Sequence, residues 1–179
     1  MINKPIGITF RESEVILAGN VAVMRHAQNV SNQVRQKYAA EHTKGLERDF
    51  DGALGEVAVA KWLNIFWNGN IGRYNAPDVG PLQVRATRAD PPHLYLHPPD
   101  KDDDMFVLVQ INRGVAYIHS WCYAREGKDP RFWGDLYQHN RPAYFVPHDS
   151  EVMRPFDAEF KQTVERLISQ TLQRKLHLV

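Results

Sequence analysis

The pattern of hydrophobic and polar residues divides the chain into a helical first part and a strand-rich second part. Apolar positions recur at helical spacing over residues 11–26 and 51–65, so both stretches are predicted to be α-helices. After residue 80, short runs that alternate or are continuously apolar predict β-strands. These runs are 82–87, 93–97, 105–111, 115–121 and 143–146.

The two predicted helices differ in how clearly their ends are marked. In the second helix, Asp51 stands where a side chain would cap the first turn. Residues 27–50 between the helices are polar and poorly periodic, which indicates a short helix and a loop. The apolar face of the first helix consists of Val15, Ile16, Ala18, Val21, Ala22 and Met24.

Two further features complete the predicted order of elements. Asn112, Arg113 and Gly114 separate two strands, which predicts a hairpin with the glycine in the left-handed conformation. A closing helix is predicted over 157–174, with Asp157 as its cap. The apolar face of this helix is formed by Phe160, Val164, Leu167, Ile168 and Leu172.

Helices, then a mostly antiparallel mixed sheet, then a helix indicate an α/β or α+β architecture in which helices flank a sheet. We expect a single domain over residues 1–179. Within it, 1–50 form a helical N-terminal region, 51–121 form the core, and 122–179 contribute a strand and a helix at the C-terminal end.

Composition places the chain among ordinary globular proteins. Hydrophobic residues make up 43% of the 179 residues, charged residues make up 24%, and the formal net charge is +1. Because Cys122 is the single cysteine, one chain cannot form a disulfide or a cysteine-based zinc site. The first residues lack a signal pattern and no apolar run could span a bilayer, so we expect a cytoplasmic protein without a membrane partner.

Glu56 is an acidic residue among apolar ones in the second predicted helix. At about 100° per residue its surface neighbours are Val59, Ala60 and Leu63, whereas Lys61 lies roughly 140° away and is poorly placed to pair with it. Two interpretations follow. The side chain points at solvent near the helix N-terminus, or it is buried and must find a partner, as a metal ligand or an acid–base group does.

Residues 77–87, PDVGPLQVRAT, bring three functional side chains close to the start of one predicted strand. Gln83 and Arg85 share a face of that strand, about 6.5–7 Å apart, and Asp78 precedes them across a glycine–proline bend. Carboxylate and amide oxygens bind hard divalent cations, and a guanidinium neutralises phosphate. The alternative is an edge strand whose polar face is only hydrated.

Two stretches, GALGEVAVAKWL at 52–63 and PDVGPLQVRAT at 77–87, resemble motifs of the PD-(D/E)XK nuclease superfamily, particularly of its small phage-type members. The resemblance implies a restriction-endonuclease-like core, Mg²⁺ or Mn²⁺ as cofactor and metal-dependent hydrolysis of DNA. In that family a helix glutamate, an aspartate after proline and a strand pair of the type acid-x-lysine bind the metal and activate water. The resemblance assigns catalysis to Glu56, Asp78, Gln83 and Arg85, and metal binding to the first three.

The chain departs from the family pattern at two positions. Gln83 replaces an acid, and its uncharged carbonyl oxygen binds a cation more weakly. Arg85 replaces a lysine and cannot act as a base, although it can hold a phosphate. An alternative is therefore a catalytically degenerate nuclease fold that binds DNA or protein, and a third is a structural or host-interaction protein of a phage.

The resemblance also implies partners and a location. Arg73, Arg85 and Arg88 are the expected contacts to DNA phosphates. Nuclease folds of this kind often act as dimers, so a homodimer is compatible with the resemblance. The expected compartment is the cytoplasm, which for a viral protein is that of the host.

Overall fold

The structure is a computed structural model that describes residues 4–31, 42–72, 76–136 and 142–176. Along the chain the helices are α1 (Glu12–Ser31), α2 (His42–Leu63), α3 (Ala124–Gly127), the 3₁₀-helix η1 (Pro130–Phe132) and α4 (Ala158–Leu176). The strands are β1 (Ile6–Ile8), β2 (Leu82–Thr87), β3 (His93–Leu96), β4 (Met105–Asn112), β5 (Val115–Tyr123), β6 (Trp133–Gly134), β7 (Ala143–Pro147) and β8 (Arg154–Pro155).

The main sheet has the strand order β1-β5-β4-β2, and β8 pairs with β5. β2 and β4 run parallel, with Leu82 opposite Met105, whereas the other pairs in this sheet are antiparallel. The sheet is therefore mixed, as the sequence predicts. The β4–β5 turn is the predicted hairpin, with Arg113 at φ 50° and Gly114 at φ 78°.

A second, smaller antiparallel sheet has the order β3-β7-β6. The sequence places β3 and β7 correctly but does not show that they leave the main sheet, and it misses β1, β6 and β8, which are too short to show a period. Phe106 and Leu108 of β4 pack against Leu94, Leu96 and Val146 of this small sheet. Hydrophobic residues on both faces of β4 are thus buried, which explains its continuously apolar sequence.

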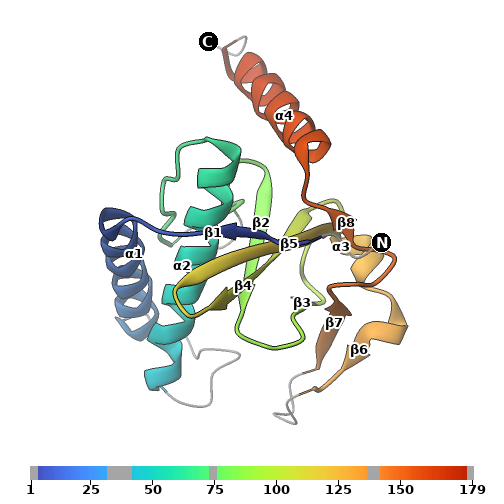
Figure 1. Cartoon of the computed structure of the whole chain (residues 1–179), viewed down its shortest axis with the longest axis horizontal. Coiled ribbons are helices and arrows are strands. Elements are labelled where there is room, and N and C mark those ends of the chain that lie inside the picture. Colours follow the sequence, from blue (N-terminus) through green and yellow to red (C-terminus); the bar gives the residue numbers. More distant parts are fainter. Residues whose placement is uncertain (1–3, 32–41, 73–75, 137–141, 177–179) are drawn as a thin grey trace.

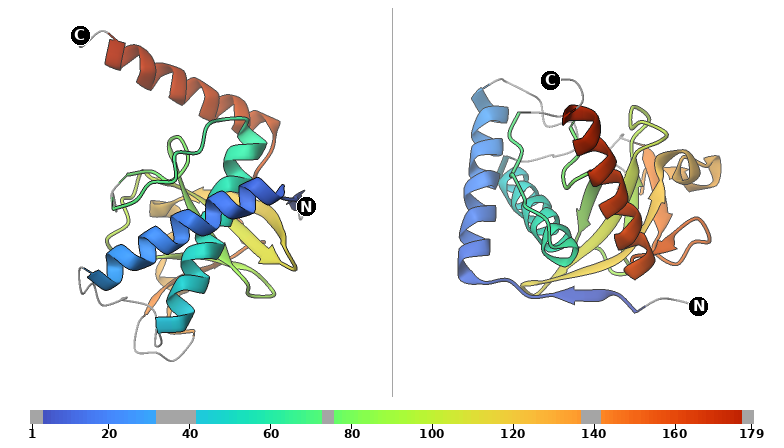
Figure 2. Two further views of the ribbon diagram at one scale, coloured as in Figure 1. Left: turned by 90° about the vertical axis from the view of Figure 1, so that its left-hand side faces the viewer. Right: turned by 90° about the horizontal axis from the view of Figure 1, so that it is seen from above.

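The long helices α1, α2 and α4 lie on the other face of the main sheet. Val107 and Val109 of β4 share a core with Leu54 and Ala58 of α2, and α2 lies between the sheet and α1 (Figures 1 and 2). Gly55 allows this close approach, since a Cβ there would lie 3.2 Å from the Cβ of Ala86. The observed layers confirm a mixed sheet flanked by helices.

α4 leaves the body of the molecule along its length (Figures 1 and 2). The carboxylate of Asp157 accepts a hydrogen bond of 3.0 Å from the backbone N–H of Phe160, which confirms the predicted cap. Phe160 stacks on Trp121 with ring centroids 4.3 Å apart, whereas Leu172 near the other end is 56% exposed. The first half of α4 therefore anchors the helix.

The start of α2 corrects a prediction. The helix begins at His42, so Asp51 does not cap it but lies within it. The Asp51 side chain is buried and pairs with Arg88, with Nε and Oδ2 2.6 Å apart. An ion pair with a residue 37 positions away, which local spacing cannot reveal, makes this interior position acceptable to an aspartate.

Candidate functional site

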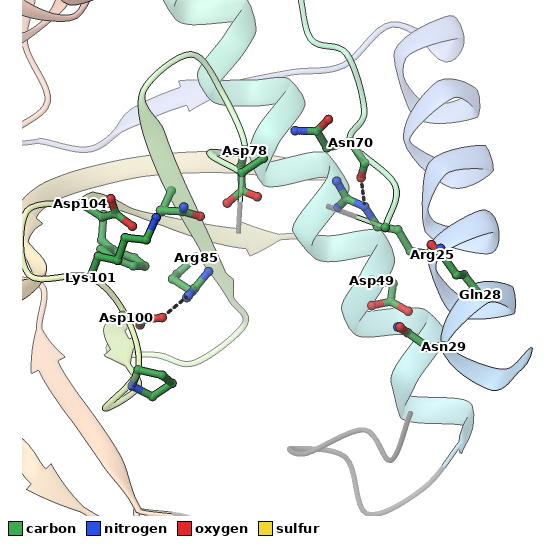
Figure 3. Close-up of a pocket in the computed structure, with 15 residues that line it drawn as sticks. Arg25, Gln28, Asn29, Asp49, Asn70, Asp78, Arg85, Asp100, Lys101 and Asp104 are labelled. Carbon is green, nitrogen blue, oxygen red and sulfur yellow. Dashed lines mark hydrogen bonds and ion pairs between the residues drawn. The ribbon is translucent and has the colours of Figure 1, made fainter. Parts of the chain in front are cut away.

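A pocket of about 270 Å³ lies beside β2, the edge strand of the main sheet (Figure 3). Its walls come from α1, α2, the segment before β2, β2 itself, the loop between β3 and β4, and the start of β4. The side chains that line it include Arg25, Asp49, Asp78, Gln83, Arg85 and Lys101. Three of the four residues assigned to catalysis by the sequence thus face one cavity.

A tight turn at Gly80, with φ 57°, brings Asp78 back onto the strand that follows it. The Asp78 backbone N–H donates to the Leu82 carbonyl over 2.8 Å, and its carboxylate accepts from the Val84 N–H, also over 2.8 Å. An edge strand has free backbone donors, and Asp78 takes up one of them. The turn therefore fixes this carboxylate beside Gln83.

Asp78 is the acid of the pocket with the most unusual environment. Burial raises its pKa to about 6, and the negative charge of Glu56 adds to this rise. The hydrogen bond from Val84 and the charges of Arg85 and Arg25 act in the opposite direction but are outweighed. Among the residues that the structure describes, no basic side chain forms an ion pair with Asp78.

Glu56 is held very differently, although it lies close enough to influence Asp78. It is only 4% exposed, which contradicts the interpretation that it points at solvent. Arg25 of α1 donates to it from its two terminal guanidinium nitrogens, at 2.7 and 2.9 Å, and the indole N–H of Trp67 donates to it over 2.9 Å. Both carboxylate oxygens are therefore engaged, and the partner that burial requires is a cation supplied by the protein.

Lys61 confirms the geometric argument made from the sequence. Its ammonium group pairs with Glu14 of α1 at 2.7 Å and donates to the Thr9 carbonyl, not to Glu56. Lys61 therefore fastens α1 and the segment before it to α2. It does not line the pocket, so it does not replace the lysine that the nuclease family has on the strand.

Arg85 lies on the face of β2 that is turned toward the small sheet. Its guanidinium lies 4.8 Å from the ring centroid of Phe106 and 5.7 Å from that of Tyr95, and it pairs with Asp100 at 3.3 Å. Its Nε is buried without a hydrogen-bond partner in the described part of the chain. Stacking thus fixes one face of the Arg85 guanidinium, while its Nε–H can still donate a hydrogen bond to a ligand.

The remaining assigned arginines are not gathered at the pocket. Arg88 pairs with Glu47 and Asp51 of α2 and does not line the cavity, so its contact to DNA stays a prediction. Arg73 lies outside the described residues.

Several residues that line the pocket carry no local sequence signal. Arg25 escaped notice because its partner is 31 positions away, and Lys101 lies in the β3–β4 loop, from which its side chain extends toward the Asp78 side of the pocket (Figure 3). Asp104 belongs to an acidic run, Asp102–Asp104, and a run of this kind before a strand is usually a solvated turn. Asp103 fits that interpretation with its 91% exposed side chain, but Asp104 faces the cavity.

Two kinds of feature are not found among the described residues. No group of three His, Cys, Asp or Glu side chains in these ranges is arranged to hold a metal ion. None of the helices described combines the length and the hydropathy needed to cross a bilayer.

Comparisons with known proteins returned nothing: no family model, no curated protein and no solved structure matches this chain.

Proposed function

We propose that the chain is a metal-dependent phosphodiesterase that acts on DNA, with a restriction-endonuclease-like core and with Asp78 as its central acid. The observation that carries this proposal is the environment of Asp78. This carboxylate is buried, has no basic partner among the described residues and shares one pocket with Gln83 and Arg85. Acids with strongly perturbed pKa values in a cavity are candidates for chemistry.

Some of the oxygen-bearing side chains at the pocket fit a hard cation, and Glu56 does not. Asp78 and the side-chain carbonyl of Gln83 are oxygen donors of the kind that Mg²⁺ and Mn²⁺ take, and they would hold the ion. Glu56 does not fit as a ligand, because Arg25 and Trp67 occupy its oxygens. We therefore assign Glu56 to positioning, which departs from the role that the family resemblance implies.

The charge balance of the pocket supports a need for the cation. Four aspartates line it against three basic residues, so a phosphate would enter an excess of negative charge. When bound, a divalent cation supplies neutralisation of the phosphate and an activated water. The aspartates are Asp49, Asp78, Asp100 and Asp104, and the basic residues are Arg25, Arg85 and Lys101.

The chain's own residues would then divide the remaining tasks. Arg85, fixed by its stacking on Phe106, would stabilise the negative charge that builds on the phosphate. Lys101 would supply the ammonium group that the strand lacks at position 85. Asp78 loses its proton near pH 6, so we expect binding and cleavage to increase as the pH rises through that value.

A second candidate keeps the fold and loses the cleavage. The engagement of Glu56 and the neutral amide at Gln83 leave fewer charged ligands than the family pattern requires. In this case the protein would bind DNA or another protein without hydrolysis.

Nicking of supercoiled plasmid with Mn²⁺ or Mg²⁺, compared with EDTA, tests the proposal. We expect metal-dependent nicking by the wild type, loss of at least about 100-fold in Asp78→Asn, and retention in the matched control Asp49→Asn, which changes another aspartate of the same pocket. Salt-sensitive DNA retention without nicking would favour the second candidate. Absence of both activities would overturn the assignment to DNA.

A further inference from the structure

The outer face of α1 is apolar where a surface helix is normally polar. α1 is the outermost helix beside α2 (Figures 1 and 2). Ala18, Val21 and Ala22 are buried on its inner face. Five large apolar side chains are nevertheless between 50% and 56% exposed: Ile16, Leu17, Val23, Met24 and Val30. Contiguous exposed apolar side chains of this size mark an interaction surface.

The charged side chains Glu14 and Arg25 of α1 are turned inward, which is the reverse of the usual arrangement, whereas Glu12 in the first turn is exposed. Glu14 pairs with Lys61, and Arg25 pairs with Glu56, both at 2.7 Å. The ring of His26 lies 3.5 Å from the carboxylate of Asp49. Every exposed position from 13 to 31 is uncharged. Beyond Glu12 in the first turn, the outer face therefore has neither a charge that would repel a partner nor one that would require a complementary charge.

The exposed positions also follow a coiled-coil spacing. Ile16, Asn20, Val23, Ala27 and Val30 are separated by four, three, four and three residues, which places them on one seam. All five are exposed. A single asparagine in the middle of such a seam specifies register and number of strands at a cost in stability.

We propose that α1 forms the interface of a homodimer, in which this seam packs against the same seam of a second copy. An uncharged apolar seam is complementary to itself, as an interface with two-fold symmetry requires. A lipid surface is the poorer match, because membrane-surface helices carry Lys and Arg on their polar side. In α1 the arginine at position 25 is instead bound to Glu56.

The size of the face fits a reversible dimer. A helix of 20 residues is about 30 Å long. Two such faces would bury on the order of 1,000 Å² in total, at the lower end of specific interfaces. We therefore expect the dimer to dissociate on dilution. This inference does not depend on the nuclease proposal, because it uses the opposite side of α1 from Arg25.

Sedimentation of the full chain from about 1 μM to about 100 μM measures the association directly. We expect twice the chain mass of 20.6 kDa at high concentration and monomer on dilution. Val23→Glu with Met24→Glu should weaken association at least about 100-fold, since each would bury a charge. Leu172→Glu on α4 is the matched control, with 56% exposure against 55% for Val23, and should leave association unchanged.

Cross-linking through cysteine gives an independent readout. Cys122, the single native cysteine, is buried, so it contributes little background. Val23→Cys should be captured as a covalent dimer by a short bismaleimide, and Leu172→Cys should not. Circular dichroism verifies that each variant is folded. A monomer at every concentration, a dimer unaffected by the charged variants, or binding to phosphatidylglycerol vesicles through this face would overturn the proposal.

Discussion

Two buried carboxylates near the pocket, Glu56 on helix α2 and Asp78 just before strand β2, are held in opposite ways. On the helix side, Glu56 is enclosed by the guanidinium of Arg25 and the indole of Trp67. On the strand side, Asp78 accepts one backbone hydrogen bond from Val84 and has a raised pKa. The two groups are close enough for the charge of Glu56 to contribute to that rise.

The difference indicates which acid is structural and which is available. A buried carboxylate whose oxygens are both occupied stabilises the contact between α1 and α2, and its removal would leave Arg25 without its ion-pair partner. A buried carboxylate without a cation destabilises the folded state at neutral pH and gains most from a ligand of positive charge. We therefore propose a structural role for Glu56 and a role in binding or catalysis for Asp78.

The largest expected effect comes from Glu56→Ala. Because this change leaves the largely buried Arg25 guanidinium without its ion-pair partner, we expect a loss of about 3–5 kcal/mol in the free energy of unfolding. Urea denaturation measures it. Glu14→Ala is the matched control, since it breaks a more exposed ion pair with Lys61 and should cost less than about 1 kcal/mol. Equal losses in the two variants would contradict a structural role for Glu56.

Asp78→Asn should increase the free energy of unfolding, and the size of this increase should depend on pH. The pKa of Asp78 is about 6 in the folded state and about 3.8 in the unfolded chain, so the folded state holds the proton more tightly and stability falls as pH rises through this window. In EDTA we expect the variant to equal the wild type near pH 4 and to exceed it by on the order of 2–3 kcal/mol at pH 8.

The difference between the two stability curves is the quantity to compare. Burial lowers the pKa of His119 to about 4, so this histidine makes stability fall as pH drops below its ordinary value. Both proteins share that effect, and it cancels in the difference. A flat difference, or a variant less stable than wild type at pH 8, would show that Asp78 carries no buried charge.

Gln83→Glu sharpens the comparison by adding charge on the strand side. A second carboxylate beside Asp78 should tighten Mn²⁺ binding by about tenfold, as measured by calorimetry. Gln28→Glu is the matched control, because Gln28 lines the same pocket from α1 (Figure 3). If both variants gain equally, the cation responds to the general charge of the cavity and not to Asp78.

The smallest effect is expected for Arg85→Lys. The ammonium group keeps the charge beside Asp100 but loses the planar stacking over Phe106 and Tyr95, so we expect a loss of about 0.5–1 kcal/mol in stability. Plasmid nicking should persist, because a cation remains at the position. Complete loss of nicking would show that the guanidinium geometry itself is required.

Periodicity predicted the helices and strands in which buried positions recur regularly. It failed where a contact with a residue far away in the sequence determines the structure. β2 was predicted with its observed bounds because Leu82, Val84 and Ala86 alternate with polar residues. For α1 the apolar spacing predicted a helix but not the buried face, since Ile16 and Met24 are more than half exposed. The small sheet could not be foreseen, because pairing of β3 with β7 joins residues about fifty positions apart.

The candidate site was predictable only in its local part. Asp78, Gln83 and Arg85 lie within eight residues of sequence, so spacing was enough to bring them together. The state of Glu56 depends on Arg25, which lies on another helix 31 positions earlier. Sequence spacing suggests where a carboxylate lies but does not reveal which basic side chain pairs with it.

The most direct test of the account is a crystal structure soaked in Mn²⁺, with anomalous diffraction to locate the ion. We expect an anomalous peak at the oxygens of Asp78 and Gln83, with Arg25 and Trp67 still bound to Glu56. If a fully soaked crystal shows no anomalous peak, or a peak remote from Asp78, the claim that Asp78 binds the metal ion is contradicted.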